Sequence, residues 1–208
     1  TAALATAASN SLTLKVDDDS AATSVALANA GTIDLDDMVF TNYKTVNIEA
    51  TENIQIASVA NAVANMTAVG ADLVFTGSGT LNNITLGNIT ANSVDASGMT
   101  GVVTLFSGGG TNTIKTGSKA DTITAQTAVA GDLTINTGAG NDTIKLIADG
   151  YVIDGGDGTD TLTAEATVDM TGLTFDLTNV EVLNIDVNAG ADTTANAFTV
   201  DSQQLTGD

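Results

Sequence analysis

Cysteine, histidine, arginine, proline and tryptophan are all absent from the sequence. Without histidine, a mechanism that needs an imidazole base is excluded, and so is a His-ligated zinc or iron site. Without cysteine, the chain has neither thiol chemistry nor a disulfide. Metal ions and internal repetition are the means that remain to replace such covalent cross-links.

Acidic residues far outnumber basic ones, with 25 Asp and Glu against 5 Lys and a formal net charge of −20. This balance excludes nucleic acid as a partner, because phosphate binding needs clustered Lys and Arg. It also disfavours contact with an anionic membrane surface, and no apolar run is long enough to span a membrane. An acidic surface suits metal cations or a partner that presents cations.

Short stretches of alternating apolar and polar residues recur along the chain, which is 43% hydrophobic. They lie at residues 12–16, 45–48, 53–56, 72–75, 83–86, 102–106, 132–135 and 182–185. The abundant Thr is β-branched and suits strands, while the 21 Gly supply turns. We therefore predict an all-β fold, built as a β-solenoid or a sandwich.

One Ala-rich segment has a different period. Val59, Val63, Met66 and Val69 fall at helical spacing. This spacing predicts a short helix, or else a flank that covers a sheet, and we attach no function to it.

Two sequence patterns each occur twice, in the same order. Residues 40–49 resemble residues 177–186, and residues 94–101 resemble residues 200–207. We therefore predict a β-rich module over 1–106, a separate repeat segment over 107–163, and the start of a second, truncated β module over 164–208. Since Thr1 begins the chain without Met and no signal-peptide pattern follows, we expect a fragment or processed product of a longer exported protein.

A nine-residue unit occurs four times between the two modules, with the pattern Gly-Gly-x-Gly-x-Asp-x-apolar-x. Residues 155–163 match every defined position, residues 137–145 lack only the first Gly, and residues 116–124 keep the second Gly, the Asp and the apolar residue. The unit at 107–115 has Asn112 in place of the Asp. In each unit, six residues would form a Gly-rich turn and three would form a short strand.

Two such units would complete one turn of a flattened helix, so that units 18 residues apart stack on one edge. Asp142 and Asp160 have this spacing, and Asp121 joins them if three extra residues are accommodated. The 107–115 unit should lie on the opposite edge. Stacked carboxylates would lie roughly 5 Å apart and would repel one another unless a cation lay between them. Calcium fits best, because it accepts six to eight oxygen ligands in flexible geometry; a turn ladder without metal is the alternative.

These nonapeptides resemble the RTX repeats of type I-secreted proteins of Gram-negative bacteria. The resemblance implies a parallel β-roll in which calcium is bound by the Asp of each unit and by carbonyl groups of the glycine turns. The residues that match are Gly117, Asp121, Gly138, Gly140, Asp142, Gly155, Gly156, Gly158 and Asp160. Lys119 replaces a turn glycine and brings a competing positive charge. Two full sites are expected, one between the 116 and 137 turns and one between the 137 and 155 turns.

The wider chain is similar to RTX-containing surface-layer (S-layer) proteins of Gram-negative bacteria, which are also rich in Thr, Ala and Gly and lack Cys. This similarity implies a secreted structural component of the cell surface that self-associates into a lattice with calcium. Cell-surface lipopolysaccharide, bound through another domain, is a further expected partner. The alternatives are a fragment of an RTX adhesin that binds a host surface or glycan, and an accessory domain of a secreted enzyme.

Other candidate sites are weaker. Carboxylates cluster at residues 17–20 and 34–37, where lattice calcium sites or solvated acidic turns would both fit. No HExxH or Gly-x-Ser-x-Gly motif is present, and with five Phe, two Tyr and no Trp no carboxylate pair stands out as a glycosidase site. We therefore expect the chain not to be an enzyme.

Overall fold

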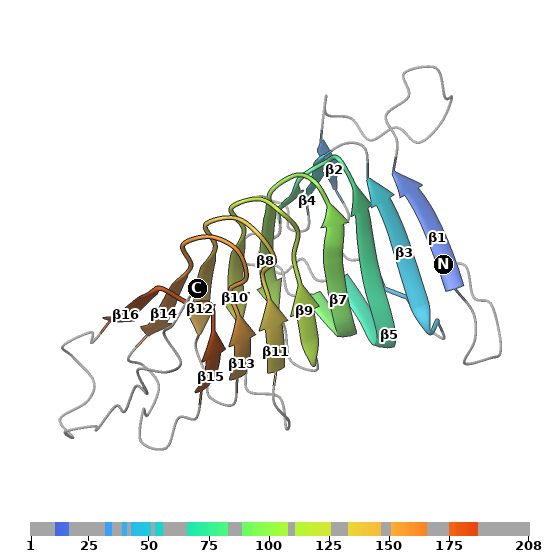
Figure 1. The fold of residues 1–208 in the computed structure, drawn as a ribbon. Coiled ribbons are helices and arrows are strands. Elements are labelled where there is room, and N and C mark those ends of the chain that lie inside the picture. The colour runs from blue at the N-terminus through green and yellow to red at the C-terminus, as the bar shows by residue number, and fades with distance from the viewer. Residues whose placement is uncertain are drawn as a thin grey trace.

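The computed structural model describes residues 11–16, 32–34, 39–40, 43–50, 53–55, 66–82, 89–107, 111–125, 133–146, 151–165 and 175–186. All secondary structure in these ranges is β, in parallel strands stacked as a β-solenoid (Figure 1). The first strands are β1 (Ser11–Val16), β2 (Thr32–Asp34), β3 (Thr45–Ala50), β4 (Asn53–Gln55), β5 (Met66–Gly77), β6 (Leu81–Asn82), β7 (Ile89–Met99) and β8 (Val103–Ser107). The remaining strands are β9 (Thr113–Lys115), β10 (Thr122–Ala125), β11 (Leu133–Asn136), β12 (Thr143–Leu146), β13 (Tyr151–Asp154), β14 (Thr161–Glu165), β15 (Phe175–Thr178) and β16 (Val182–Asp186).

The strands alternate between the two faces of the solenoid. Each odd-numbered strand pairs in parallel with the next odd-numbered one, from β1 through to β15. Even-numbered strands do the same from β2 to β16. The predicted all-β class and solenoid arrangement are therefore confirmed. Parallel pairing along both faces excludes an antiparallel sandwich for the described residues.

Apolar side chains form columns inside the solenoid, one residue from each strand. On the even-numbered strands β10, β12 and β14, the residue in the column is the apolar residue of the nonapeptide. The residue that pairs with it on β8 extends the column. The residues are Leu105, Ile123, Ile144 and Leu162 on the even face and Val94, Ile114, Ile135, Ile153 and Leu177 on the odd face. All are buried. Each such side chain contributes roughly 1.5–3 kcal/mol by leaving water, so these columns fix which strand faces point inward.

The helix predicted from the spacing of Val59, Val63, Met66 and Val69 is wrong for the part of it that the structure describes. Met66 begins β5, pairs with Ile89 on β7 and is fully buried. Pairing with neighbouring turns of the solenoid has overridden the local helical pattern. Val59 and Val63 lie outside the described residues, as does the strand predicted at 83–86.

Strand pairing continues across residues 106–107 and 163–164. The first of these positions, a predicted module boundary, lies within β8, which pairs with β10. The second predicted boundary lies within β14, which pairs with β16. The repeated pattern at 40–49 and 177–186 contributes β3 to the odd face and β16 to the even face. The second copy of the other pattern, at 200–207, lies outside the described residues, as do the acidic cluster at 17–20 and all but Asp34 of the cluster at 34–37.

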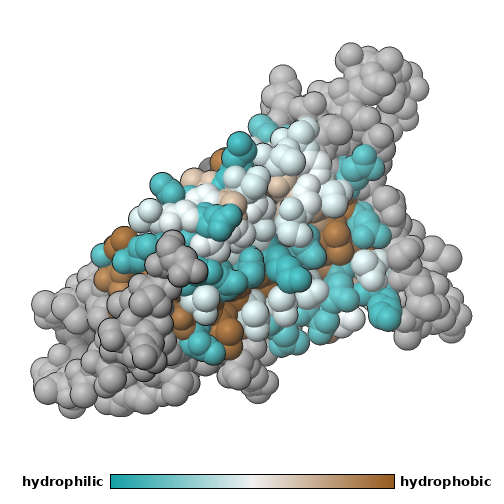
Figure 2. Space-filling view, in the orientation of Figure 1, coloured by the Kyte–Doolittle hydropathy of each residue, from teal (hydrophilic) through white to brown (hydrophobic). Residues whose placement is uncertain are grey.

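The surface seen in Figure 2 is mainly hydrophilic or near-neutral, with hydrophobic residues in smaller patches. Few large apolar side chains are strongly exposed among the described residues; Val39 and Val69 are the most exposed, at 65% and 72%. None of the described segments forms a helix with the length and apolarity that a membrane crossing requires.

Candidate metal centre

Three six-residue turns lie stacked along one edge of the solenoid, where odd-numbered strands lead into even-numbered ones (Figure 1). They comprise residues 116–121, 137–142 and 155–160, and we call them turns A, B and C. The strands that leave turns A and B pair with Thr122 opposite Thr143, a step of 21 residues. Those that leave turns B and C pair with Thr143 opposite Thr161, a step of 18 residues. The predicted stacking of these three units is therefore confirmed.

Each turn ends in an aspartate, and the three aspartates form a hydrogen-bonded ladder. The main-chain N–H of Asp121 donates to Oδ1 of Asp142 at 2.7 Å, and that of Asp142 donates to Oδ1 of Asp160 at 2.7 Å. The main-chain N–H of Val103 donates to Oδ1 of Asp121 at 2.8 Å. Every carboxylate therefore accepts a main-chain hydrogen bond from the preceding coil of the solenoid.

The ladder is buried, and part of it lacks hydrogen-bond partners. Asp121, Asp142 and Asp160 are each at most 1% exposed. Oδ2 of Asp121 accepts a hydrogen bond from the main-chain N–H of Gly117 at 3.1 Å. Oδ2 of Asp142 and Oδ2 of Asp160 are buried and accept none. A buried carboxylate oxygen without a donor is costly, so these two atoms point to a cation as the missing partner.

Burial raises the pKa of all three aspartates above the ordinary carboxyl value of 3.8. The pKa of Asp160 rises to about 6, mainly by burial, with the negative charges of Asp142, Glu181 and Asp154 adding to the effect. Main-chain N–H donors oppose the rise at each position, and the hydroxyl groups of Thr116 and Thr137 also lower the pKa of Asp121 and of Asp142 respectively. The folded ladder thus disfavours the ionised form of its own carboxylates, and a bound cation would reverse this preference.

Glycines allow successive turns to approach each other through their carbonyl groups. Gly156 has φ +85° and Gly158 has φ +146°, a region that side chains with a Cβ rarely adopt. A Cβ on Gly156 would overlap the carbonyl oxygen of Gly138, and one on Gly158 would overlap that of Gly140. Carbonyl oxygens of turn B therefore point into the interval between turns B and C. The same relationship holds one turn earlier, where Gly138 and Gly140 face the carbonyl groups of Gly117 and Lys119.

The first residue of turns A and B is a threonine, and its hydroxyl group links it to the next turn. Thr116 Oγ1 donates to the carbonyl oxygen of Thr137 at 2.9 Å, and Thr137 Oγ1 donates to that of Gly155 at 2.7 Å. Both threonines are buried, at 2% and 0% exposed. In the nine-residue pattern these two positions lack the first glycine, but in the fold their threonines supply hydrogen bonds between turns.

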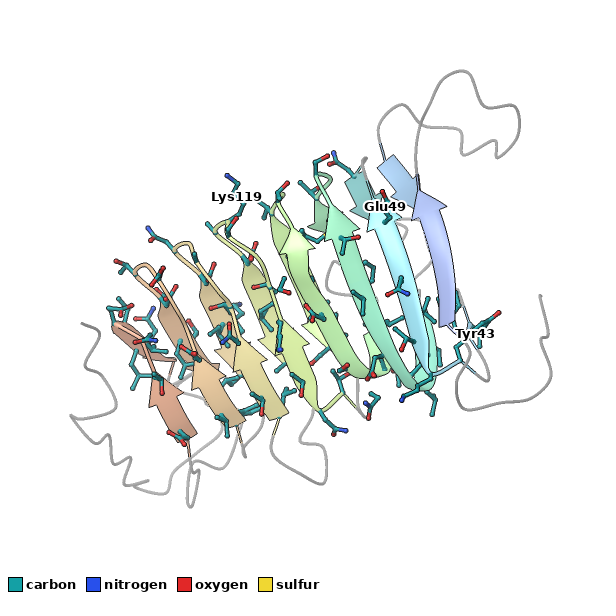
Figure 3. The ribbon with its side chains drawn as sticks, turned by 45° about the vertical axis from the view of Figure 1, so that its right-hand side comes forward. Tyr43, Glu49 and Lys119 are labelled. Carbon is teal, nitrogen blue, oxygen red and sulfur yellow. The ribbon has the colours of Figure 1, made fainter. Side chains whose placement is uncertain are left out.

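Lys119, in turn A, does not bring its charge into the stack. Its side chain is exposed and extends outward from the turn edge (Figure 3). Its main-chain carbonyl group still faces Gly140 of turn B. The predicted competition between this ammonium group and a cation is therefore weaker than the sequence suggested.

The unit at 107–115 contributes its strand, β9, to the odd face, where β9 pairs with β7 and β11. Ser107 ends β8 and residues 111–112 precede β9, so the described parts of this unit lie where even-numbered strands lead into odd-numbered ones, opposite to turns A, B and C, as predicted. Asn112, which replaces the Asp, is exposed and its Nδ2 donates to Oδ1 of Asn92 at 3.4 Å. This residue takes no part in the aspartate ladder.

The donors in the A–B and B–C intervals are of the kind that calcium prefers, namely carboxylate and main-chain carbonyl oxygens. Within the described ranges, no group of three or more Asp or Glu side chains suited to a metal ion is found. Carbonyl groups would therefore have to supply most of the ligands. Carbonyl oxygens that already accept one hydrogen bond, such as that of Gly155, keep a second lone pair. The residues present thus fit a calcium ion in chemistry.

One acidic residue of the ladder was missed by sequence reasoning. The main-chain N–H of Asp160 donates to Oε2 of Glu181 at 2.7 Å, so Glu181 occupies the place of the next aspartate. The register supports this, because Thr161 and Val182, the residues that follow each of them, are paired. The turn before β16 has three residues, 179–181, so the nine-residue pattern does not extend to it.

Comparison of the chain with protein-family models, with curated proteins and with solved structures finds no match.

Proposed function

We propose that this chain is a structural segment of a self-assembling bacterial surface layer, folded and held rigid by calcium. The observation that carries the calcium part is the buried ladder of turns A, B and C, in which Oδ2 of Asp142 and Oδ2 of Asp160 have no hydrogen-bond partner. Two buried carboxylates with orphaned oxygens on adjacent turns need positive charge. Lys119, in turn A, directs its side chain outward instead (Figure 3).

Calcium would be held in the two intervals between the stacked turns. Asp121 and Asp142, with carbonyl groups of the 117–119 backbone, would hold it between turns A and B. Asp142 and Asp160, with carbonyl groups of Gly138 and Gly140, would hold it between turns B and C. The ion supplies charge neutralisation for the carboxylates and a link between turns that are 21 and 18 residues apart.

Calcium binding would be coupled to folding, because the ladder brings together residues from separate turns and does not exist in the unfolded chain. In a compartment with little calcium, the acidic turns would repel one another and the segment would stay loose enough for export. Outside the cell, calcium would drive the turns together. A secreted, cell-surface location and type I secretion are consistent with this coupling and form part of the proposal.

A structural role in a lattice suits a solenoid of this kind. Stacked parallel turns give a stiff body whose stability is added turn by turn, and the mixed polar surface offers no concentrated apolar binding patch on the face seen in Figure 2. The lattice itself rests on the resemblance to surface-layer proteins. Self-association and attachment to lipopolysaccharide through another domain are the partners that this proposal includes.

The test is electron microscopy of the chain before and after calcium is added. Ordered sheets that form with calcium and dissolve with a chelator are the expected result. Asp142→Asn should form no sheets at the calcium concentration that suffices for the native chain. Asp157→Asn, which removes the same charge from an exposed position of turn C, should form them normally. Calcium-folded monomers that bind a host surface or glycan would instead establish the adhesin alternative.

A further inference from the structure

The aspartate ladder does not end at turn C. Glu181, in the three-residue turn 179–181, accepts the main-chain N–H of Asp160 through Oε2 at 2.7 Å. This contact repeats the one that Asp160 makes with Asp142 and that Asp142 makes with Asp121. A third interval, between turn C and the 179–181 turn, therefore has a carboxylate on both sides.

This interval differs from the other two in the first residue of the turn that precedes it. Turns A and B begin with Thr116 and Thr137, whose hydroxyl groups donate to the carbonyl oxygen of the next turn. Turn C begins with Gly155, which has no hydroxyl group to donate to the carbonyl oxygen of Asn179. A Cβ on Gly155 would overlap that carbonyl oxygen and would lie 2.7 Å from Oδ2 of Asp160.

Two oxygens thus converge on the point above Gly155 where a side chain would begin. One is the carbonyl oxygen of Asn179, and the other is Oδ2 of Asp160. The side chain of Asp160 is 0% exposed, and this oxygen is buried without a hydrogen-bond partner. Convergent oxygens with no hydrogen between them repel each other unless a cation joins them.

The side chain and backbone of Asn179 fix the direction of its carbonyl group. Asn179 has φ +52°, the one positive value for a non-glycine residue within the described segments. Its Nδ2 donates to Oδ1 of Asp154 at 2.9 Å, and the main-chain N–H of Gly155 donates to the carbonyl oxygen of Thr178 at 3.0 Å. A side chain that anchors an uncommon backbone conformation fixes the direction of the carbonyl group next to the interval.

We propose that the interval between turn C and the 179–181 turn is a further calcium site, formed by Oδ2 of Asp160, the carboxylate of Glu181 and the carbonyl oxygen of Asn179. This inference rests on the proposed calcium function and extends it beyond the nine-residue repeats. Glu181 is exposed, so water would complete the coordination on its side. The site would join the repeat segment to β15 and β16.

The opposite end of the ladder has no equivalent. Both oxygens of Asp121 already accept main-chain hydrogen bonds, from Val103 at 2.8 Å and from Gly117 at 3.1 Å. The turn before β8, residues 100–102, contains no carboxylate. Main-chain N–H groups therefore satisfy both carboxylate oxygens at the first end of the ladder. At its last end, Oδ2 of Asp160 has no donor.

Isothermal titration of the full chain with calcium tests the inference through stoichiometry. Glu181→Gln removes the charge but keeps an amide oxygen that can accept the Asp160 N–H, so the fold should be retained. Circular dichroism with saturating calcium checks this. Glu49→Gln is the matched control: Glu49 is an exposed carboxylate on β3, at the other end of the solenoid (Figure 3).

Glu181→Gln should bind one calcium ion per chain fewer than the native protein, and Glu49→Gln should bind the native number. If Glu181→Gln binds the native number with native affinity, the inference is overturned while the proposed function stands. If the native chain binds no calcium, both are overturned. Asp142→Asn probes the proposed function separately, since Asp142 lies outside this interval.

Discussion

The main-chain N–H of Asp142 donates a 2.7 Å hydrogen bond to Oδ1 of Asp160, in the next turn of the solenoid. This bond uses one oxygen of the carboxylate and leaves Oδ2 buried without a partner. The hydrogen bond alone therefore positions a charge that the fold does not neutralise. Calcium between the turns would neutralise this charge.

Asp142→Asn should have opposite effects with and without calcium. The amide oxygen can still accept the Asp121 N–H, but the buried negative charge is lost. Without calcium, the variant should be at least as stable as the native chain, because a desolvated charge has been removed. With calcium, it should melt at a lower temperature than the native chain. Thermal melts under both conditions check this.

The control for this prediction is Asp157→Asn, which removes the same charge from an exposed side chain of turn C. Its melting temperature should follow that of the native chain in both conditions. Equal losses in the two variants with calcium would mean that net charge, and not the buried ladder, governs the response.

Gly156→Ala should lower the free energy of unfolding of the calcium-bound chain by at least about 1 kcal/mol. Gly156 has φ +85°, and a Cβ there would overlap the carbonyl oxygen of Gly138. Urea denaturation with saturating calcium measures the loss. Ser118→Ala, at an exposed position of turn A, should change the free energy of unfolding by less than about 0.5 kcal/mol. Similar values for the two variants would contradict the close approach of turns B and C.

Thr137→Val should cost about 1–3 kcal/mol, because it leaves the carbonyl oxygen of Gly155 without the donor that now lies at 2.7 Å. Valine keeps the shape of the buried side chain, so the loss reports the hydroxyl group of Thr137, which also lowers the pKa of Asp142. Thr134→Val, on the exposed side of β11, is the control and should be close to neutral. A neutral Thr137→Val would show that the hydroxyl link between turns B and C adds nothing to stability.

The metal-free chain should lose stability as the pH rises. Burial first, and then the charges of Asp142, Glu181 and Asp154, raise the pKa of Asp160 to about 6, from 3.8 in the unfolded chain. A raised carboxyl pKa stabilises the fold fully below the unfolded value, and that contribution is lost as pH rises through the folded value. Asp121 shifts in the same direction. The melting temperature in chelator should therefore fall between about pH 4 and pH 6.

Asp160→Asn should flatten this pH dependence, since it removes the carboxyl group whose pKa is raised to about 6. Calcium affinity should change in the opposite direction and rise with pH, because the ligands must be ionised to bind. A metal-free melting temperature that rises steadily from pH 4 to pH 6 would contradict the raised pKa values.

The parts of the fold that sequence could predict are those with a fixed period. The spacing of Asp142 and Asp160 gave the stacking of turns B and C, and the apolar position at Ile144 and Leu162 gave the inward column. Asp121 could be placed in the same stack because turns A and B are both six residues long. The step is 21 because three more residues separate β10 from β11 in the sequence than separate β12 from β13.

The parts that sequence did not predict depend on pairing between turns. Met66 follows a helical spacing, yet it pairs with Ile89 and lies in β5. Glu181 follows a three-residue turn, so the nine-residue pattern does not include it, and only its register with Asp160 reveals its role. A signal could have been found in the residue before each of the last four even-numbered strands, β10, β12, β14 and β16, where Asp, Asp, Asp and Glu recur.

The most direct test of the account is the thermal unfolding of the native chain, followed by circular dichroism with calcium and with EDTA. Since the turns of Asp121, Asp142 and Asp160 come together only in the fold, calcium should raise the melting temperature and sharpen the transition. Chelation at neutral pH should lower the melting temperature and reduce the β signal. An identical spectrum and melting temperature in calcium and in EDTA would contradict the central claim.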